Sequence, residues 1–189
     1  MDAGGNHSLA LQASGDVFAW GENGYGQAPV PTNQNNAAQV SAGYSHSTVL
    51  LRDGTIKVWG DNYYGQKDIP IDMKKVLQIS AGGYHTLTLN EDGTVSAWGH
   101  NHYGQCTVPQ GLSGVIQVSS GGYHSLALKN DGTVWAFGDN THGKCGIGKL
   151  SPGYLSSPVK ILDGVAEISA TDQNAFALMT DGRIMGWGL

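Results

Sequence analysis

The chain has 189 residues, a length that allows one domain with a hydrophobic core. Its formal net charge is −5 and it has no run of basic residues, so the electrostatic signature of a nucleic-acid-binding protein is missing. No apolar run reaches about 18 residues and no signal peptide is recognisable, so we expect no membrane partner and leave the cellular compartment open.

One segment recurs along the chain. The first copy, "DAGGNHSLALQASGDVFAWGENGYGQ", ends at Gln27, and a weaker last copy, "SATDQNAFALMTDGRIMGWG", ends at Gly188. The histidines of the first four copies are 39 residues apart: His7, His46, His85 and His124. The final step, from Phe137 to Trp187, is 50 residues, with 11 extra residues in "GIGKLSPGYLS". A fixed period near 40 residues indicates a tandem repeat array.

Each repeat has the pattern of a small antiparallel sheet. In the third repeat, "VLQIS" at 76–80 is a short apolar run that predicts a strand. "HTLTLN" alternates, with Leu87 and Leu89 on one face, and "TVSAWG" alternates again. Between them Asp92-Gly93 predicts a hairpin turn, and Pro109 in "CTVP" suits a sheet edge. We therefore expect three to four strands in each repeat.

Because one small sheet cannot bury both of its faces, neighbouring repeats must stack, and radial stacking of short sheets gives a β-propeller. We expect a single all-β repeat domain over residues 1–189, a propeller or propeller arc of about five blades. The first blade is expected to lack its leading strand, since the apolar run before the hairpin occurs four times and the hairpin five times. The approximate blade limits are 1–30, 31–69, 70–108, 109–158 and 159–189.

The stretch "SAGGYHTLTLNEDGTVSAWGHNHYGQ" resembles the regulator-of-chromosome-condensation repeat, and the resemblance covers nearly the whole chain. The short spacing is most similar to bacterial members, among them the propeller-type β-lactamase inhibitory proteins. The resemblance implies a ring that usually has seven blades, whereas this chain supplies about four and a half. An open arc exposes strand edges and an apolar sheet face, so we expect self-association that completes the propeller.

The periodic aromatic and histidine side chains are interpreted as structural. An active site needs different residues that converge, and a radial array holds its equivalent residues apart. We expect each histidine to hydrogen-bond to backbone within its blade, and the tryptophans to pack between blades. These residues are His7, His46, His85, His124, Trp20, Trp59, Trp98 and Trp187.

Positions that vary within the repeat are better candidates for binding a partner. Tyrosines there supply large, rigid contact area at low entropic cost. The resemblance implies that two loop positions, one just before the histidine and one after Trp-Gly, lie on the binding face. It points to Tyr63, Tyr64, Tyr84, His102, Tyr103 and Tyr123. The alternative is that the periodic tyrosines Tyr25, Tyr64 and Tyr103 only pack their loops.

Metal and thiol chemistry find little support. His100, His102, Cys106, His142 and Cys145 have the right side chains for zinc, but the ligands belong to different blades, so we expect no metal site. The two cysteines occupy equivalent places in neighbouring sheets about 10 Å apart, which is too far for a disulfide. We therefore expect two free thiols and no cofactor.

No nucleophile elbow or phosphate loop is present, so we expect no enzymatic activity. The leading hypothesis is a non-enzymatic β-propeller that binds an unidentified protein through its tyrosine-bearing loops, in the manner of an inhibitor. One alternative is a structural repeat segment of a larger secreted or surface protein without a specific partner. A further alternative is sugar binding or catalysis in the propeller pore.

Overall fold

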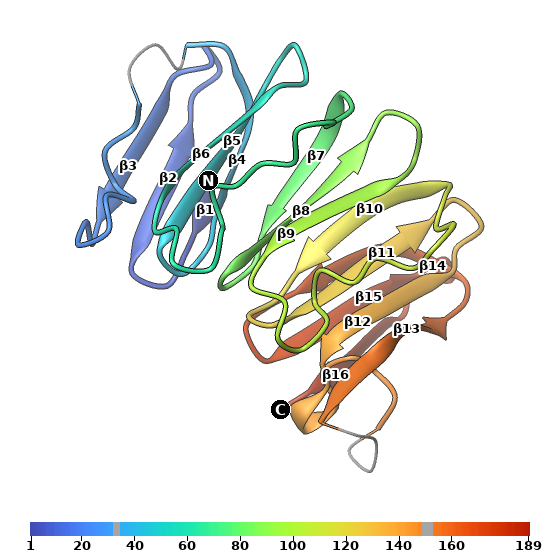
Figure 1. The fold of residues 1–189 in the computed structure, drawn as a ribbon. Helices are drawn as coiled ribbons and strands as arrows, with labels where there is room; N and C mark the ends of the chain where they lie inside the picture. The colour runs from blue at the N-terminus through green and yellow to red at the C-terminus, as the bar shows by residue number, and fades with distance from the viewer. Residues whose placement is uncertain (32–34, 149–152) are drawn as a thin grey trace.

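A computed structural model describes residues 1–31, 35–148 and 153–189. Its strands form five antiparallel sheets that follow one another in chain order and fan out from a common side (Figure 1). The all-β fold of about five blades predicted from the repeat is confirmed. Within the described ranges, the helical structure is the short 3-10 turn η1 (Thr141–Gly143), and no helix is long and apolar enough to cross a membrane.

The strand limits follow the repeat closely. The first blade contains β1 (Asp2–Ala3), β2 (His7–Leu11) and β3 (Val17–Gly21). The second contains β4 (Ala37–Ala42), β5 (His46–Leu51) and β6 (Ile56–Gly60), and the third β7 (Val76–Ala81), β8 (His85–Asn90) and β9 (Val95–Gly99). The fourth contains β10 (Val115–Ser120), β11 (His124–Lys129), β12 (Val134–Asp139) and β13 (Tyr154–Leu162). The fifth contains β14 (Val165–Ala170), β15 (Asn174–Met179) and β16 (Ile184–Gly188).

Two blades differ from the pattern expected from the sequence. The first was expected to lack its leading strand, but the two-residue β1 pairs with β2 in that place. In the fourth blade, β13 adds an outer strand to β12. The extra residues of the last repeat step lead into β13, and residues 149–152 of that insertion lie outside the described residues.

The hairpin turns are built as the Asp-Gly signal predicts. In the third blade, Gly93 has a φ of 75°, a left-handed conformation that favours glycine. The Asp92 carboxylate accepts hydrogen bonds from the backbone N–H of Thr94 at 3.1 Å and from its hydroxyl at 2.6 Å. The aspartate therefore fixes the turn that aligns β8 with β9.

Apolar residues of one blade are buried against the next blade. Leu87 and Leu89 of the third blade form one core cluster with Ala127 and Phe137 of the fourth. Trp98 packs on the other side of the third blade, where its indole N–H donates to the Gln66 carbonyl of the second blade at 2.8 Å. Each blade therefore has a leucine face toward its successor and a tryptophan face toward its predecessor.

Side chains of the inner strands fix the spacing between blades. The Gln78 side chain accepts a hydrogen bond from the Val118 N–H at 2.9 Å and donates to the Val118 carbonyl at 3.1 Å. Ser80 Oγ accepts from the Ser120 N–H at 2.9 Å. Because the same contacts join the second blade to the third and the fourth to the fifth, they act as a ladder along the inner wall.

Candidate functional site

The repeat histidines lie buried between blades. The His85 ring is 0% exposed, and its Nε2 lies 2.9 Å from Ser125 Oγ of the next blade. Ser125 in turn donates its hydroxyl hydrogen to the Gln105 carbonyl at 2.8 Å, so His85 Nε2 must donate to Ser125. His7 and His46 reach Ser47 and Thr86 in the same way. The expected bond to backbone within the same blade is therefore wrong, because the partner is a hydroxyl of the following blade.

Burial keeps these imidazoles neutral. Desolvation lowers the pKa of His46 to about 4, of His85 to about 3 and of His124 to about 4. Their Nδ1 atoms have no hydrogen-bond partner among the described residues and face a glycine, which for His85 is Gly82. A Cβ at Gly82 would lie 2.3 Å from the ring, which explains the glycine. The geometry of His7, His46 and His85 suits blade-to-blade bonding rather than proton transfer. His124 Nε2 has no such partner among the described residues, because Ala175 stands where the other blades have a hydroxyl.

Eight aromatic rings form one connected network on a single face. Neighbouring ring centroids are 4.5 to 6.5 Å apart, and most pairs meet edge to face, a favourable arrangement for aromatic groups. We call this surface the aromatic face, and its members are Tyr44, Tyr63, Tyr64, Tyr84, His100, His102, Tyr103 and Tyr123. It therefore contains all six of the residues selected from the sequence as partner-binding.

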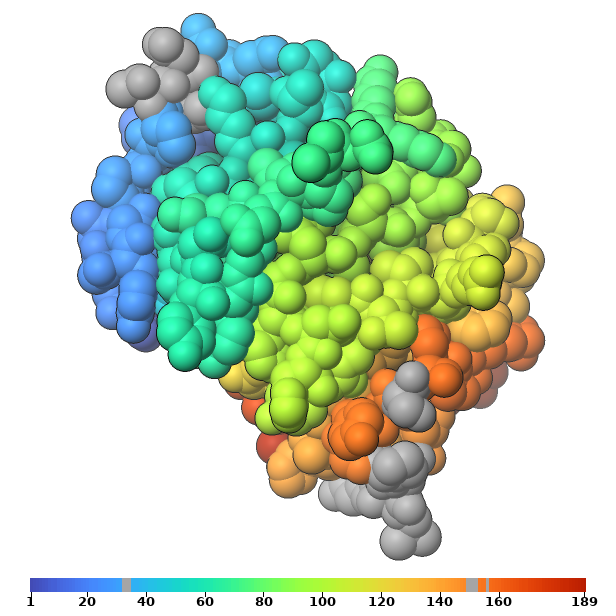
Figure 2. Space-filling model, in the orientation of Figure 1, coloured from blue at the N-terminus to red at the C-terminus, as the bar shows by residue number. Residues whose placement is uncertain are grey.

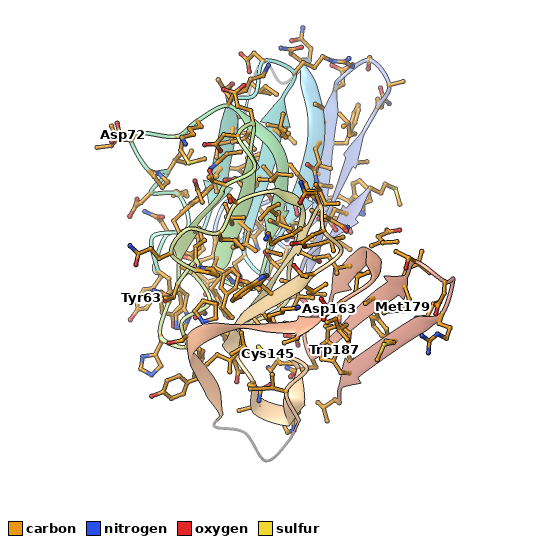
Figure 3. All side chains as sticks on the ribbon, turned by 90° about the vertical axis from the view of Figure 1, so that its right-hand side faces the viewer. Tyr63, Asp72, Cys145, Asp163, Met179 and Trp187 are labelled. Atoms are coloured by element: carbon orange, nitrogen blue, oxygen red, sulfur yellow. The ribbon has the colours of Figure 1, made fainter. Side chains whose placement is uncertain are left out.

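The aromatic face has an exposed rim and a half-buried floor. Tyr63 is 83% exposed and projects away from the ribbon in Figure 3, and Tyr64 is 42% exposed. Tyr84 and Tyr123 are half-buried, with ring centroids 5.7 Å apart. Burial and the neighbouring tyrosines raise the pKa of Tyr123 to about 12, so its hydroxyl stays protonated and can donate a hydrogen bond. Such a surface offers apolar area together with fixed polar groups.

A buried glutamine sets the shape of each tyrosine loop. The Gln66 side chain is 0% exposed, and its Oε1 accepts the backbone N–H of Tyr64 at 2.8 Å. Gln105 holds Tyr103 in the same way at 3.1 Å. The glutamine thus holds the loop through the tyrosine backbone, and the tyrosine ring takes no part in this hydrogen bond. Tyr25 belongs to an equivalent loop but makes no ring contact within the described chain.

His100 lies at the centre of the aromatic face. Its ring contacts those of Tyr64 at 4.5 Å, Tyr123 at 5.6 Å and Tyr103 at 5.8 Å. Its Nδ1 lies 2.6 Å from Gln105 Nε2, which donates to it, and desolvation lowers its pKa. From the sequence, His100 stands out only as a possible zinc ligand. The missed signal is that the other strong copies carry a carboxylate at this position: Glu22, Asp61 and Asp139.

Tyr44 is the second member of the aromatic face that the sequence interpretation missed. The second repeat reads "AGYSH" where the third reads "AGGYH". Tyr44 therefore stands two residues before its histidine, whereas Tyr84 stands directly before its own. Its ring lies 5.1 Å from that of Tyr84, and its hydroxyl donates to the Asp172 carboxylate of the fifth blade. The ring packs against Gly83, where a side chain would clash with it.

The candidate metal ligands do not converge. In the part of the chain that the structure describes, no three His, Cys, Asp or Glu side chains gather into a possible ion site. Both cysteines are free, as their spacing predicts, and burial raises the pKa of each thiol to about 12. Cys106 donates to the His100 carbonyl at 3.3 Å and Cys145 to the Asp139 carbonyl at 3.2 Å. His142 is exposed on η1.

The inner strands line a groove of about 890 Å³. It is lined by three glutamines whose side-chain nitrogen and oxygen both hydrogen-bond to the backbone of the next blade: Gln39, Gln78 and Gln117. Its serines Ser41, Ser80 and Ser119 accept backbone N–H groups of the next blade. The groove therefore offers few uncommitted polar side chains to a ligand.

The profile of the regulator of chromosome condensation (RCC1) repeat matches four segments of the chain, residues 1–27, 37–66, 76–105 and 115–144. A search of curated proteins gives no match.

Solved structures share the fold. Human WBSCR16 superposes with a TM-score of 0.84 at 20% identity, covering 99% of this chain and 60% of its own. Yeast RCC1 (Prp20), solved with Kap60 bound, gives 0.84 at 24% identity, covering 99% and 55%. The ectodomain of the Arabidopsis thaliana receptor kinase ACR4 gives 0.70 at 24% identity, covering 99% and 62%. The chain thus spans less than two thirds of the length of these structures.

Proposed function

Because the chain belongs to the regulator of chromosome condensation (RCC1) repeat family, we propose that it is a non-enzymatic protein-binding module whose aromatic face contacts the partner. One observation carries the proposal: six side chains that vary between repeats form one connected surface of eight rings with the periodic Tyr64 and Tyr103, while the repeated histidines are buried between blades. Repeat proteins place their specificity at such variable surface positions.

The chemistry of the aromatic face suits protein recognition. Tyrosine buries a large amphipathic surface and loses little side-chain entropy, and it is enriched among residues that dominate binding energy. Tyr84 and Tyr123 are partly pre-buried and fixed by neighbouring rings, which lowers the cost of ordering them on binding. Among the neighbours, yeast RCC1 was solved with a protein, Kap60, and its structure was studied with binding to Gsp1p and histones.

The narrower proposal is an inhibitor-like mode, in which the exposed rim enters a cleft of the partner. Tyr63 is the most exposed tyrosine of the aromatic face, at 83%, and its ring lies 4.8 Å from that of Tyr64, which supports this mode. Sugar binding or catalysis in the groove has less support, since the groove glutamines and serines are committed to the ladder.

Site-specific photo-crosslinking tests the proposal. A photoreactive phenylalanine replaces Tyr63 on the rim, and in a control it replaces Ile71, which is fully exposed on a loop beside the hairpin turn of the second blade. In extract of the source organism, position 63 should capture a discrete protein that position 71 does not. Capture should disappear when Tyr84 and Tyr123 are both changed to Ala. Equal labelling from both positions would contradict the proposal.

The inhibitor-like mode has its own test. A panel of purified class A β-lactamases is assayed with the chain and with its Tyr63→Ala variant. If the chain inhibits an enzyme of the panel and the variant does not, the result supports insertion of the exposed rim into the enzyme's cleft. Binding of a partner without inhibition of its activity would leave the protein-binding proposal standing and would remove the inhibitor-like mode.

A further inference from the structure

A buried glutamine connects His100 to the tyrosine loop of the third blade. The Gln105 side chain is 0% exposed, its Oε1 accepts the Tyr103 backbone N–H at 3.1 Å, and its Nε2 lies 2.6 Å from His100 Nδ1. Because a backbone N–H can only donate, Gln105 must point its Oε1 to Tyr103 and its NH2 group to His100. His100 Nδ1 is therefore the acceptor, and the neutral ring carries its proton on Nε2.

The second and fourth blades have a carboxylate as this acceptor. Gln66 Nε2 donates to Asp61 Oδ2 at 3.2 Å, and Lys144 Nζ pairs with Asp139 at 2.8 Å. A carboxylate remains an acceptor down to about pH 4, whereas a histidine changes its charge near pH 6.5. The third blade thus has a group that titrates in mild acid where these two blades have a lasting negative charge.

A second proton on His100 would place two N–H donors face to face across 2.6 Å. If the Gln105 amide turned to offer its Oε1 to the ring, its NH2 group would face the Tyr103 N–H instead. If the amide stayed, the ring would have to move away, so one contact is lost in either case. The first blade shows that a missing acceptor alone is tolerated. Gln27 holds the Tyr25 N–H at 2.9 Å although its Nε2 has no partner among the described residues.

The change would reach the rings of three blades. The loops that follow β6 and β9, teal and yellow-green, adjoin one another on the surface (Figure 2). The His100 ring contacts Tyr64 of the second blade at 4.5 Å and Tyr123 of the fourth at 5.6 Å. Asn101 Oδ1 accepts the Cys106 N–H at 2.8 Å and keeps the end of the loop in place. We therefore expect the displacement near residue 103 and at the rings that touch His100.

The surroundings of His100 favour its neutral form at pH 7. Desolvation lowers its pKa, and the like charge of His102 lowers the pKa further. The ring is thus neutral at pH 7 and gains its charge only below pH 6.5. The other titratable groups around it are uncharged between pH 5 and 7.5: Tyr64, Tyr84, Tyr103, Tyr123, His85 and the thiol of Cys106.

We propose that His100 is a proton-sensitive switch of the aromatic face, which holds Gln105 and the Tyr103 loop in the binding arrangement while neutral and releases them when protonated. The inference rests on the proposed protein-binding function of this face. A bound partner would cover the ring and oppose its charge further, so the partner is held near neutral pH and released in mild acid. Once His100 is protonated in the free chain, the dissociation constant should rise about tenfold for each further pH unit.

Nuclear magnetic resonance spectra of the free chain test the switch without a partner. Between pH 7.5 and 5, the Tyr103 backbone amide and the Gln105 side-chain amide should shift with the same midpoint as the His100 ring. The Tyr25 backbone amide, held by a glutamine without a titrating acceptor, should not follow them. A His100 ring that does not titrate down to pH 5 would overturn the proposal, and so would amides that stay fixed while the ring titrates.

Two variants and a control assign the shifts to His100. His100→Asp reproduces the pair of Asp61 with Gln66 and should abolish the Tyr103 shift over this pH range. His100→Asn, an acceptor that is neutral at every pH, should do the same if the carboxylate disturbs the neighbouring rings. His142→Asn removes an exposed histidine outside the aromatic face and should keep the shift. An equal Tyr103 shift in folded His100→Asp and His100→Asn would contradict the switch.

The dissociation constant of the protein captured from position 63 then measures the effect on binding. The slope of its logarithm against pH should be smaller by about one unit for His100→Asp than for wild type, and this difference cancels any titration of the partner. Equal slopes would overturn the link between His100 and binding. If the aromatic face captures no protein, the proposed function fails by itself, because the spectra of the free chain still decide whether the switch exists.

Discussion

The hydroxyl of Tyr44 in the second blade donates to the carboxylate of Asp172 in the fifth blade, across the mouth of the groove. Burial and then this hydrogen bond raise the pKa of Tyr44 above its usual range. The contact joins blades that are not neighbours along the chain, and it anchors one edge of the aromatic face.

Removing this hydroxyl should loosen the arc slightly. Tyr44→Phe keeps the ring and loses one hydrogen bond to a charged group, so the free energy of unfolding should fall by about 1 to 2 kcal/mol. Chemical denaturation measures the change. Tyr63→Phe is the matched control, since its exposed hydroxyl makes no hydrogen bond within the described chain. Equal effects of the two changes would mean that the Tyr44 hydroxyl contributes nothing.

Stability should fall on mild acidification. The pKa values of His46, His85 and His124 are about 4, 3 and 4 in the folded chain, against about 6.5 when unfolded. Between pH 6.5 and about 4 the unfolded chain therefore binds more protons, so the free energy of unfolding decreases as pH falls. Each histidine contributes about 1.4 kcal/mol per pH unit.

Denaturation curves between pH 7 and 5 check this slope. His85→Asn, which places in the third blade the residue found at Asn174, should reduce the slope by about a third, as expected when one of three such histidines is lost. A free energy of unfolding that does not change over this interval would show that the buried histidines are not the titrating groups.

The fourth blade replaces the loop glutamine with Lys144, which pairs with Asp139 at 2.8 Å while the two side chains are 2% and 8% exposed. Lys144→Met should cost about 3 kcal/mol or more because it leaves a buried carboxylate without its counter-charge. Lys144→Gln should cost clearly less, since Gln66 in the second blade donates to Asp61 from the same position at 3.2 Å. Thermal unfolding of the two variants ranks them, and the reverse order would contradict this interpretation.

The tryptophans of the second, third and fifth blades should each be worth one hydrogen bond more than a phenylalanine. Trp98→Phe removes the bond from the indole N–H to the Gln66 carbonyl and also some buried area, so we expect a loss of about 1 to 3 kcal/mol. Phe137 stands at this position in the fourth blade and is fully buried, so the fold accepts the change. Denaturant titration gives the difference, and an unchanged midpoint would contradict it.

The blade architecture could be predicted because its signals are local and periodic. Alternating leucines, the Asp-Gly turn at Asp92-Gly93 and the 39-residue period each follow from short-range chain geometry. The aromatic face could be predicted in part for the same reason. Tyr63, Tyr84 and Tyr123 stand out as variable residues at fixed repeat positions.

What the sequence could not show depends on contacts between blades. Tyr44 is shifted by one position, so alignment by the period hides that it meets Tyr84. The hydroxyl partner of His85 is Ser125, 40 residues away, and only the stacking distance decides that the ring reaches the next blade rather than its own backbone. The leading strand of the first blade was missed because two residues carry no readable pattern.

The central claim is that the aromatic face carries binding, and the dissociation constant of the protein captured from position 63 tests it most directly. Tyr123 of the fourth blade lies half-buried against Tyr44 of the second blade and Tyr84 of the third, so Tyr123→Ala should weaken binding at least tenfold, as expected for a residue that dominates binding energy. Ile71→Ala should leave the constant unchanged. A Tyr123→Ala variant that binds as tightly as wild type would contradict the claim.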